Sequence, residues 1–240
     1  NPAGNTTLFV QSTPQGLVDA LNMEISELHV MANEVYAEVA DEEFNTADNG
    51  YLATWIDADG VGCKQLDTVA REQELFEGYT IHLLQELLPK NSQLVVANSM
   101  SIRDMDYFWS GNRHSAIIYG NRGVNGIDGT VSTALGIATN GMPTVLLTGD
   151  LTFFHDLNGL AVSKTHPLNV TIIVHNNDGG GIFEYLPQKG TPYFDYLFST
   201  AQGLDYSGLA TLYGIDFVRV ASNDELKNVY YDNIQKNFED

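Results

Sequence analysis

The segment from Thr144 to His175 constrains the fold of this chain more than any other. Its pattern predicts a strand, a helix and a second strand, at residues 144–148, 152–164 and 170–175. The 26 residues between Asp150 and Asn177 are the length that a chain needs to leave the tip of one parallel strand and return at the tip of the next. The segment therefore predicts neighbouring parallel strands.

Helices and strands alternate along the rest of the chain from Lys64 onward. Further strands are expected at residues 93–97, 115–119 and 216–220, and further helices at 74–88, 129–139, 207–213 and from 224. Continuous apolar strands separated by helices are typical of a mostly parallel sheet with helices on both faces. We therefore expect an α/β fold.

Residues 1–64 lack this regular alternation and are expected to form a short N-terminal appendage. Their patterns predict a strand at 7–11, helices at 15–21 and 25–39, an acidic linker at 41–50 and a helical segment at 52–56. The stretch after Ile56, Asp57-Ala-Asp-Gly, has the start of a calcium loop, but Val61 and Thr68 occupy positions where such a loop needs oxygen ligands. We interpret it as a turn.

Composition excludes several classes of protein. A hydrophobic content of 43% with 10% aromatic residues argues against a disordered chain, and the apolar runs are too short to cross a bilayer. Eleven basic residues against 31 acidic ones give a net charge of −20, which makes nucleic acid a poor partner. Cys63 is the single cysteine, so there is no disulfide framework, and a reducing cytoplasm is expected. Asn1 in place of Met indicates an excised fragment or a processed terminus.

Two oxygen-bearing side chains follow the strands of the opening segment. Asp150 comes after the first strand and Asn177 after the second, at the edge where parallel sheets bind their ligands. A carboxylate and an amide oxygen suit Mg²⁺, which completes its octahedron with phosphate and water oxygens. A helix opening near Leu151 would add free N–H groups for a diphosphate. These features favour a magnesium–diphosphate site, although this pattern alone is also met as two ordinary turns.

The chain resembles a known family in four stretches, which occur in that family's order and spacing. The stretches are Asn98–Asp104, Asn121–Gly129, Gly149–Gly159 and Asn176–Phe183. The family is that of 2-succinyl-5-enolpyruvyl-6-hydroxy-3-cyclohexene-1-carboxylate synthase, a thiamine diphosphate enzyme of menaquinone biosynthesis. The resemblance is specific between residues 98 and 183 and weakens towards both ends.

The resemblance implies a set of site residues. Asp150, Asn177 and the carbonyl of Gly179 would bind Mg²⁺ or Mn²⁺. Ile127 would support the bent cofactor as the catalytic-site residue contributed by this chain. The cofactor would be held by Gly149, Asp150, Leu151, Asn177, Gly179, Gly180, Ile182 and Phe183.

The resemblance also implies a substrate-binding group. Ser99, Arg103 and Arg122 would hold the substrate carboxylates, because the planar guanidinium of arginine can bind a carboxylate through two hydrogen bonds. Without the resemblance, a surface salt bridge of these arginines with Asp104 or Asp106 is the simpler interpretation.

One position departs from the family. Relatives often carry Asn where this chain has Asp178. The added carboxylate would either repel a diphosphate or point away from it.

The activity implied is decarboxylation of 2-oxoglutarate followed by 1,4-addition of the succinyl unit to isochorismate. Residues 65–240 would form the C-terminal, diphosphate-binding domain, and residues 1–64 the tail of the middle domain with a linker. The full-length enzyme would be a homo-oligomer, a dimer or tetramer, and this chain alone would be inactive, because the family's activating glutamate lies on an N-terminal domain. None of these conclusions comes from composition or spacing.

Two alternatives stay open at this point. Another thiamine diphosphate enzyme, such as an acetohydroxyacid synthase or a decarboxylase, would keep the magnesium motif but lack the Ser99, Arg103 and Arg122 group. A non-catalytic phosphate-binding module would carry no thiamine diphosphate. The glycines at 123, 126 and 129 do not have the spacing of a dinucleotide-binding loop, which argues against a nicotinamide cofactor.

Overall fold

The structure of the chain, a computed structural model, describes residues 50–72, 75–109 and 116–232. The expected elements at 7–11, 15–21, 25–39 and 41–50 lie outside or at the edge of these residues. The chain divides into two compact units, 1–58 and 59–240. Its described helices and strands are α2 (Gly50–Glu72), α3 (Glu77–Leu87), β1 (Gln93–Val96), α4 (Met100–Phe108), β2 (Ile117–Gly120), α5 (Thr130–Ile137), η2 (Ala138–Asn140), β3 (Thr144–Gly149), α6 (Asp150–His155), η3 (Leu157–Lys164), β4 (Val170–His175), η4 (Gly181–Tyr185), η5 (Asp195–Ser199), α7 (Gly208–Tyr213) and α8 (Asn223–Tyr230).

The four described strands form one parallel sheet in the order β2-β1-β3-β4. Strand β4 pairs with β3 from Thr144 opposite Val170 to Gly149 opposite His175. The prediction of a parallel sheet is thus confirmed, and β3 and β4 end side by side. The side chains that follow them start from adjacent points on one edge of the sheet.

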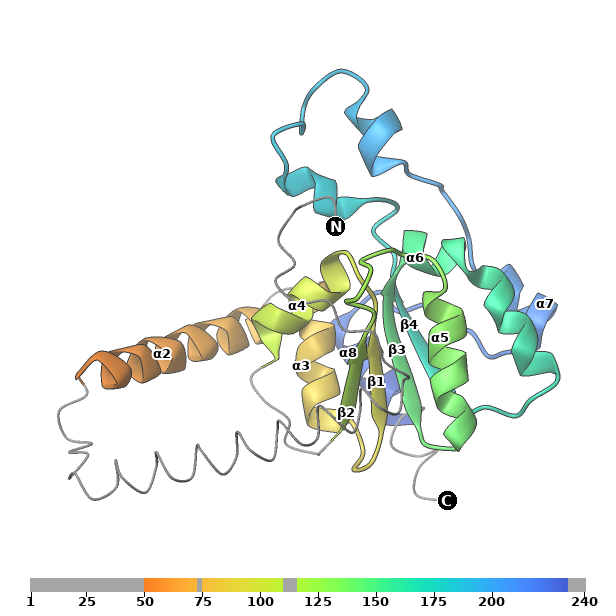
Figure 1. The fold of residues 1–240 in the computed structure, drawn as a ribbon, viewed down its shortest axis with the longest axis horizontal. Helices are drawn as coiled ribbons and strands as arrows, with labels where there is room; N and C mark the ends of the chain where they lie inside the picture. Colours follow the sequence, from red (N-terminus) through yellow and green to blue (C-terminus); the bar gives the residue numbers. More distant parts are fainter. Residues whose placement is uncertain (1–49, 73–74, 110–115, 233–240) are drawn as a thin grey trace, which may run out of the picture. The chain divides into compact units, whose positions relative to one another are not determined.

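Alternating side chains of the central strands enter two separate cores. Leu94 and Val145 pack on one face with residues of α3, α4 and α8, whereas Val95 and Leu146 pack on the other with residues of α5, α6 and η3. This division follows from the period of two along a strand. Figure 1 shows α3 and α4 on one side of the sheet and α5 on the opposite side. The predicted cover of helices on both faces is therefore confirmed.

Helix α2 corrects the turn expected after Ile56. The helix runs without a break through Asp57–Gly62. Two glycines in a helix interior cost about 1 kcal/mol each relative to alanine, which is why the sequence favours a break there. Tertiary contacts of the later turns outweigh this local cost.

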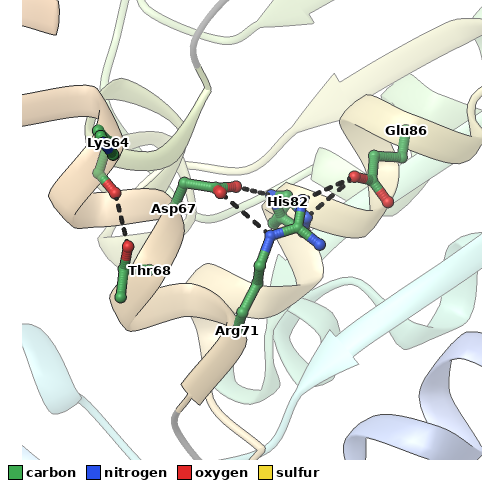
Figure 2. Close-up of polar contacts among 6 residues, drawn as sticks. All are labelled: Lys64, Asp67, Thr68, Arg71, His82 and Glu86. Atoms are coloured by element: carbon green, nitrogen blue, oxygen red, sulfur yellow. Dashed lines mark hydrogen bonds and ion pairs between the residues drawn. The ribbon is translucent and has the colours of Figure 1, made fainter.

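Those contacts form a ring of charged side chains between α2 and α3, drawn in Figure 2. Arg71 bonds to Asp67 and to Glu86, each at 3.0 Å. The buried ring of His82 lies between the same carboxylates, at 3.1 Å from Asp67 and 3.2 Å from Glu86. Within the same part of α2, the hydroxyl of Thr68 donates a hydrogen bond to the carbonyl of Lys64 at 2.9 Å. The ring attaches the second half of α2 to α3.

Three further expectations differ from the structure. Residues 216–220 form no strand, and Phe217 and Val218 are largely exposed there. The helix expected at 152–164 is divided into the short α6 and the 3₁₀ segment η3. Helix α4 lies between the strands expected at 93–97 and 115–119, where the sequence predicted no helix. Among the described helices, none is long and apolar enough to span a membrane.

Candidate functional site

A cavity of about 130 Å³ lies at the edge where β3 and β4 end. It collects ten of the residues singled out from the sequence: Ser99, Ile127, Gly149, Asp150, Leu151, Asn177, Gly179, Gly180, Ile182 and Phe183. They come from the residue before α4, from the loop before α5, from the end of β3 and the start of α6, and from the turn after β4 and the η4 segment that follows it. Residues that are far apart in the sequence, from Ser99 to Phe183, thus share one concave surface. Arg103 and Arg122 are not among the lining residues.

Asp150 is the buried carboxylate of this cavity, with 3% of its surface exposed. Burial raises the pKa of its carboxyl above the usual value, while hydrogen bonds from the backbone N–H groups of Leu151 and Gly179 favour the charged form and oppose that rise. The negative charge of Asp178 adds to the increase in pKa. A cation bound beside Asp150 would relieve the cost of this buried charge.

Tyr206 holds the backbone of Asp150 in place through a hydrogen bond. Its hydroxyl donates to the Asp150 carbonyl at 3.1 Å, and its ring packs edge-on against Phe153 with centroids 5.4 Å apart. Burial, followed by the charge of Asp150, raises the pKa of the Tyr206 hydroxyl to about 12. The hydroxyl therefore stays a neutral donor at physiological pH.

Three successive glycines let the backbone after Asn177 approach its surroundings closely. A Cβ on Gly180 would lie 2.7 Å from the Phe183 ring and 2.8 Å from the Phe198 carbonyl oxygen. A Cβ on Gly181 would lie 2.8 Å from the Asn177 amide nitrogen. Gly179 has φ +142 and faces the carbonyl oxygen of Ser199. Side chains are thus excluded where the backbone borders the cavity.

The donor set suits a hard divalent cation. Asp150 offers a carboxylate, Asn177 an amide oxygen and Gly179 a backbone carbonyl, and Mg²⁺ takes few protein oxygens when phosphate and water supply the rest. Within the described residues, no group of three or more His, Cys, Asp or Glu side chains is placed to hold a metal. Helix α6 has only six residues, so the helix dipole expected at Leu151 is weak.

Asp178 points away from the cavity. Its Oδ1 atom accepts hydrogen bonds from the backbone N–H groups of Gln202, at 3.1 Å, and Gly203, at 2.7 Å. Of the two orientations that the sequence allowed, the structure therefore has the outward one. The carboxylate still acts through its charge on Asp150.

The two arginines lie beside the cavity and are exposed. Arg103 belongs to helix α4, where the sequence predicted no helix, and its Nη1 donates to the Ser99 carbonyl at 2.6 Å. Arg122 donates to the Asn98 side chain at 2.7 Å, and Asn98 donates in turn to the carbonyls of Asn121 and Gly126. Arg103 thus bonds to backbone, and neither arginine forms an ion pair with Asp104 or Asp106 among the described contacts.

Ser99 takes an unusual backbone conformation between these groups. Its φ of +68 and ψ of −128 lie outside the regions that non-glycine residues prefer. Such strain persists only where the surroundings fix the backbone, as the Arg103 bond to the Ser99 carbonyl does here. The conformation is consistent with a functional position.

The cavity wall also carries three titratable residues to which the sequence analysis gave no catalytic or binding role: Glu77, Asp104 and His175. Asp104 is 7% exposed and its Oδ2 has no hydrogen-bond partner. Burial, then the charge of Glu77, raises the pKa of Asp104 to about 6. Burial lowers the pKa of His175 to about 4, and its Nε2 has no partner either. The position of His175, directly before Asn176 and Asn177, was the one signal available in the sequence.

Comparisons with known proteins show which family this chain resembles. The synthase of Lactococcus lactis subsp. cremoris (strain SK11), named 2-succinyl-5-enolpyruvyl-6-hydroxy-3-cyclohexene-1-carboxylate synthase, is 49% identical over 223 residues, or 92% of this chain and 36% of that protein. The protein of the same name from Desulfitobacterium hafniense is 46% identical over 219 residues, or 91% of this chain and 38% of that protein. This chain therefore spans little more than a third of the length of these relatives.

A solved structure shares the fold. Benzoylformate decarboxylase from Polynucleobacter necessarius matches with a TM-score of 0.54 and 23% sequence identity, over 67% of this chain and 31% of its own. The family model for the thiamine pyrophosphate enzyme, C-terminal TPP binding domain, matches residues 99–237, which is more than half of the chain. This range includes the ends of β3 and β4, every lining residue of the cavity except Glu77, and both arginines. The chain therefore belongs to the thiamine pyrophosphate enzyme family, through the C-terminal, cofactor-binding domain of that family.

Proposed function

We propose that this chain carries the cofactor-binding part of a 2-succinyl-5-enolpyruvyl-6-hydroxy-3-cyclohexene-1-carboxylate synthase. Such an enzyme decarboxylates 2-oxoglutarate and transfers the succinyl unit to isochorismate. The observation that carries the proposal is the meeting of Asp150, Asn177, Gly179 and Ile127 in one cavity. The names and the 46–49% identity of the relatives support the choice of this activity among those of the family.

The cavity accounts for one end of the cofactor. Its volume of about 130 Å³ is below the roughly 300–1,000 Å³ of sites that enclose a whole drug-sized ligand. It therefore fits a diphosphate with its metal ion better than complete thiamine diphosphate. Asp150, Asn177 and the Gly179 carbonyl would hold Mg²⁺ or Mn²⁺, and the backbone of the glycine turn would border the diphosphate.

Bound thiamine diphosphate would supply the electron sink that decarboxylation of a 2-oxo acid requires. The residues of this chain would bind the cofactor, orient the substrate and exclude water. Ile127 gives an apolar wall, and Phe183, packed at 5.8 Å against Phe198, covers another side. Arg103 and Arg122 keep exposed guanidinium groups at the rim, where they would orient substrate carboxylates through paired hydrogen bonds.

Calorimetric titration of thiamine diphosphate in the presence of Mg²⁺ tests the cofactor site. Asp150→Asn removes the charge that faces the metal and keeps the size of the side chain. We expect its affinity to fall by roughly 100-fold or more, because a charged ligand bond contributes about 3 kcal/mol. The thermal midpoint of the ligand-free variant should not fall, since burial already disfavours the Asp150 charge.

The matched control is Asp216→Asn, which removes an exposed carboxylate outside the cavity and should leave the affinity unchanged. Equal affinity of the wild type and folded Asp150→Asn would contradict the assignment of the metal ligand. Wild-type protein that binds no thiamine diphosphate at millimolar concentration would contradict the proposed function as a whole.

A further inference from the structure

Residues 179–201 leave the sheet edge after Asp178 and return at Gln202, and we call this segment the excursion. It contains η4 and η5, and Figure 1 shows it in teal to blue beyond the edge where α6 begins. Its outer surface carries exposed aromatic side chains, with Tyr185, Tyr193 and Tyr196 all more than 75% exposed. Its start includes cavity residues, so its position affects the site directly.

The two ends of the excursion are joined at its base. Oδ1 of Asp178 accepts the N–H groups of Gln202 at 3.1 Å and of Gly203 at 2.7 Å. Next to this pair, the N–H of Gly180 donates to the Ser199 carbonyl at 2.7 Å. We call these three hydrogen bonds the junction; the Asp178 carboxylate accepts two of them, and the third joins backbone to backbone.

The backbone of Asp178 is arranged to direct its side chain there. The residue has φ +59, in the left-handed region that Asp and Asn adopt more readily than other non-glycine residues. Its own N–H donates to Oδ1 of Asn176 at 3.1 Å. These bonds hold the turn in which Asn177 and Gly179 flank Asp178.

The junction is coupled to the site through both neighbours. Gly179 donates its N–H to the Asp150 carboxylate, and the Asn177 amide contacts the backbone at Gly181. Displacing residues 199–203, the returning end of the excursion, would release the Ser199 carbonyl from the Gly180 N–H and so move the backbone beside Asp150. The Asp178 carboxylate itself is directed away from the cavity.

We propose that Asp178 is a positioning residue, whose carboxylate joins the ends of the excursion and thereby holds Asn177 and Gly179 in place without contacting the ligand. The inference rests on the proposed function for its effect on cofactor binding. Its structural part, the closed base of the excursion, is independent of that function. The two parts are separated by two measurements on the same variants.

The variants are Asp178→Asn and Asp178→Gly. Asparagine keeps an acceptor oxygen and tolerates the left-handed backbone, whereas glycine accepts the same φ without strain but removes the acceptor. A difference between them therefore reports the hydrogen bonds to Gln202 and Gly203 and not backbone strain. Asp216→Gly serves as the control for a lost exposed carboxylate.

The first measurement is limited digestion with chymotrypsin, which cleaves at exposed tyrosines of the excursion. Asp178→Gly should be cut there about tenfold faster than wild type, because two hydrogen bonds to a carboxylate no longer oppose opening. Asp178→Asn should stay within about threefold of wild type. Cleavage of Asp178→Gly at the wild-type rate, or of Asp178→Asn at the rate of Asp178→Gly, would overturn the proposal.

The second measurement is calorimetric titration of each protein with thiamine diphosphate in the presence of Mg²⁺. It is made on variants whose unfolding midpoint, followed by circular dichroism, equals that of wild type. Asp178→Gly should bind about tenfold more weakly, and Asp178→Asn should recover affinity to within about threefold. Equal affinity of all three proteins would overturn the positioning role. If wild type binds no cofactor, the proposed function fails, and the digestion result alone decides whether Asp178 closes the excursion.

Discussion

Asp104 gives the clearest test of the electrostatics in the cavity wall. Its carboxyl is buried in α4 and its pKa is raised from 3.8 to about 6. Between these two pH values the native protein holds a proton that the unfolded chain has released. The free energy of unfolding therefore falls as the pH rises from about 4 to 6, and the loss remains at higher pH.

The size of this effect follows from the shift. A shift of about two pKa units corresponds to about 3 kcal/mol, which is an upper bound because water in the cavity screens the charge. Asp104→Asn has no proton to lose and should be more stable than wild type by about 1–2 kcal/mol at pH 8. The difference should nearly vanish at pH 4.

Urea unfolding followed by far-ultraviolet circular dichroism at pH 4, 6 and 8 measures this difference. Asp106→Asn is the matched control, since Asp106 lies on the same helix and is exposed. Glu77→Gln should reduce the pH dependence of the wild type, because the charge of Glu77 contributes to the raised pKa of Asp104. A stability difference between Asp104→Asn and wild type that stays constant from pH 4 to 8 would refute the reasoning.

Two further predictions concern binding and packing. Arg103→Ala and Arg122→Ala should each weaken binding of 2-oxoglutarate or isochorismate to the cofactor-loaded protein by roughly 10- to 150-fold, with thiamine diphosphate affinity unchanged. If both variants bound both substrates as tightly as wild type in equilibrium titrations, the role of the arginines would be contradicted. Gly180→Ala should lower the free energy of unfolding by about 1–3 kcal/mol, because its Cβ would lie 2.7 Å from the Phe183 ring. Gly136→Ala, whose Cβ meets nothing within 4 Å, should be neutral or stabilising in the same denaturation assay, and an equal loss in both variants would show that close packing at Gly180 is not the cause.

The strongest sequence predictions rest on local periodicity. The strand at 170–175 was predicted with the bounds that the structure has, and the strand at 144–148 differs by one residue. Both are mainly apolar runs between two layers of helices, with β3 buried and β4 half-buried. Residues 216–220 form no strand, and Phe217 and Val218 are exposed; strand formation also depends on backbone pairing with a neighbouring strand, which local periodicity does not report.

Helix α2 shows the opposite case. Gly60 and Gly62 weaken the local preference for helix, yet Asp67 and Arg71 connect its later turns to His82 and Glu86 of α3. Contacts between residues 15 positions apart, as in the Arg71–Glu86 pair, therefore decide a conformation that local propensity leaves open. The sequence contained all four residues but gave no indication of their pairing.

In the candidate site, too, some features follow from local sequence and others depend on tertiary contacts. The chain length between Asp150 and Asn177 determined by itself that both residues lie at the tips of neighbouring parallel strands, because one helical crossover returns the chain to the same edge of the sheet. The direction of the Asp178 side chain, the exclusion of the two arginines from the cavity, and the meeting of Glu77, Asp104 and His175 were decided only by the tertiary structure. Periodicity fixes which edge a residue occupies, whereas side-chain direction and shared burial depend on partners from distant elements, such as Gln202 for Asp178 and α3 for Asp104.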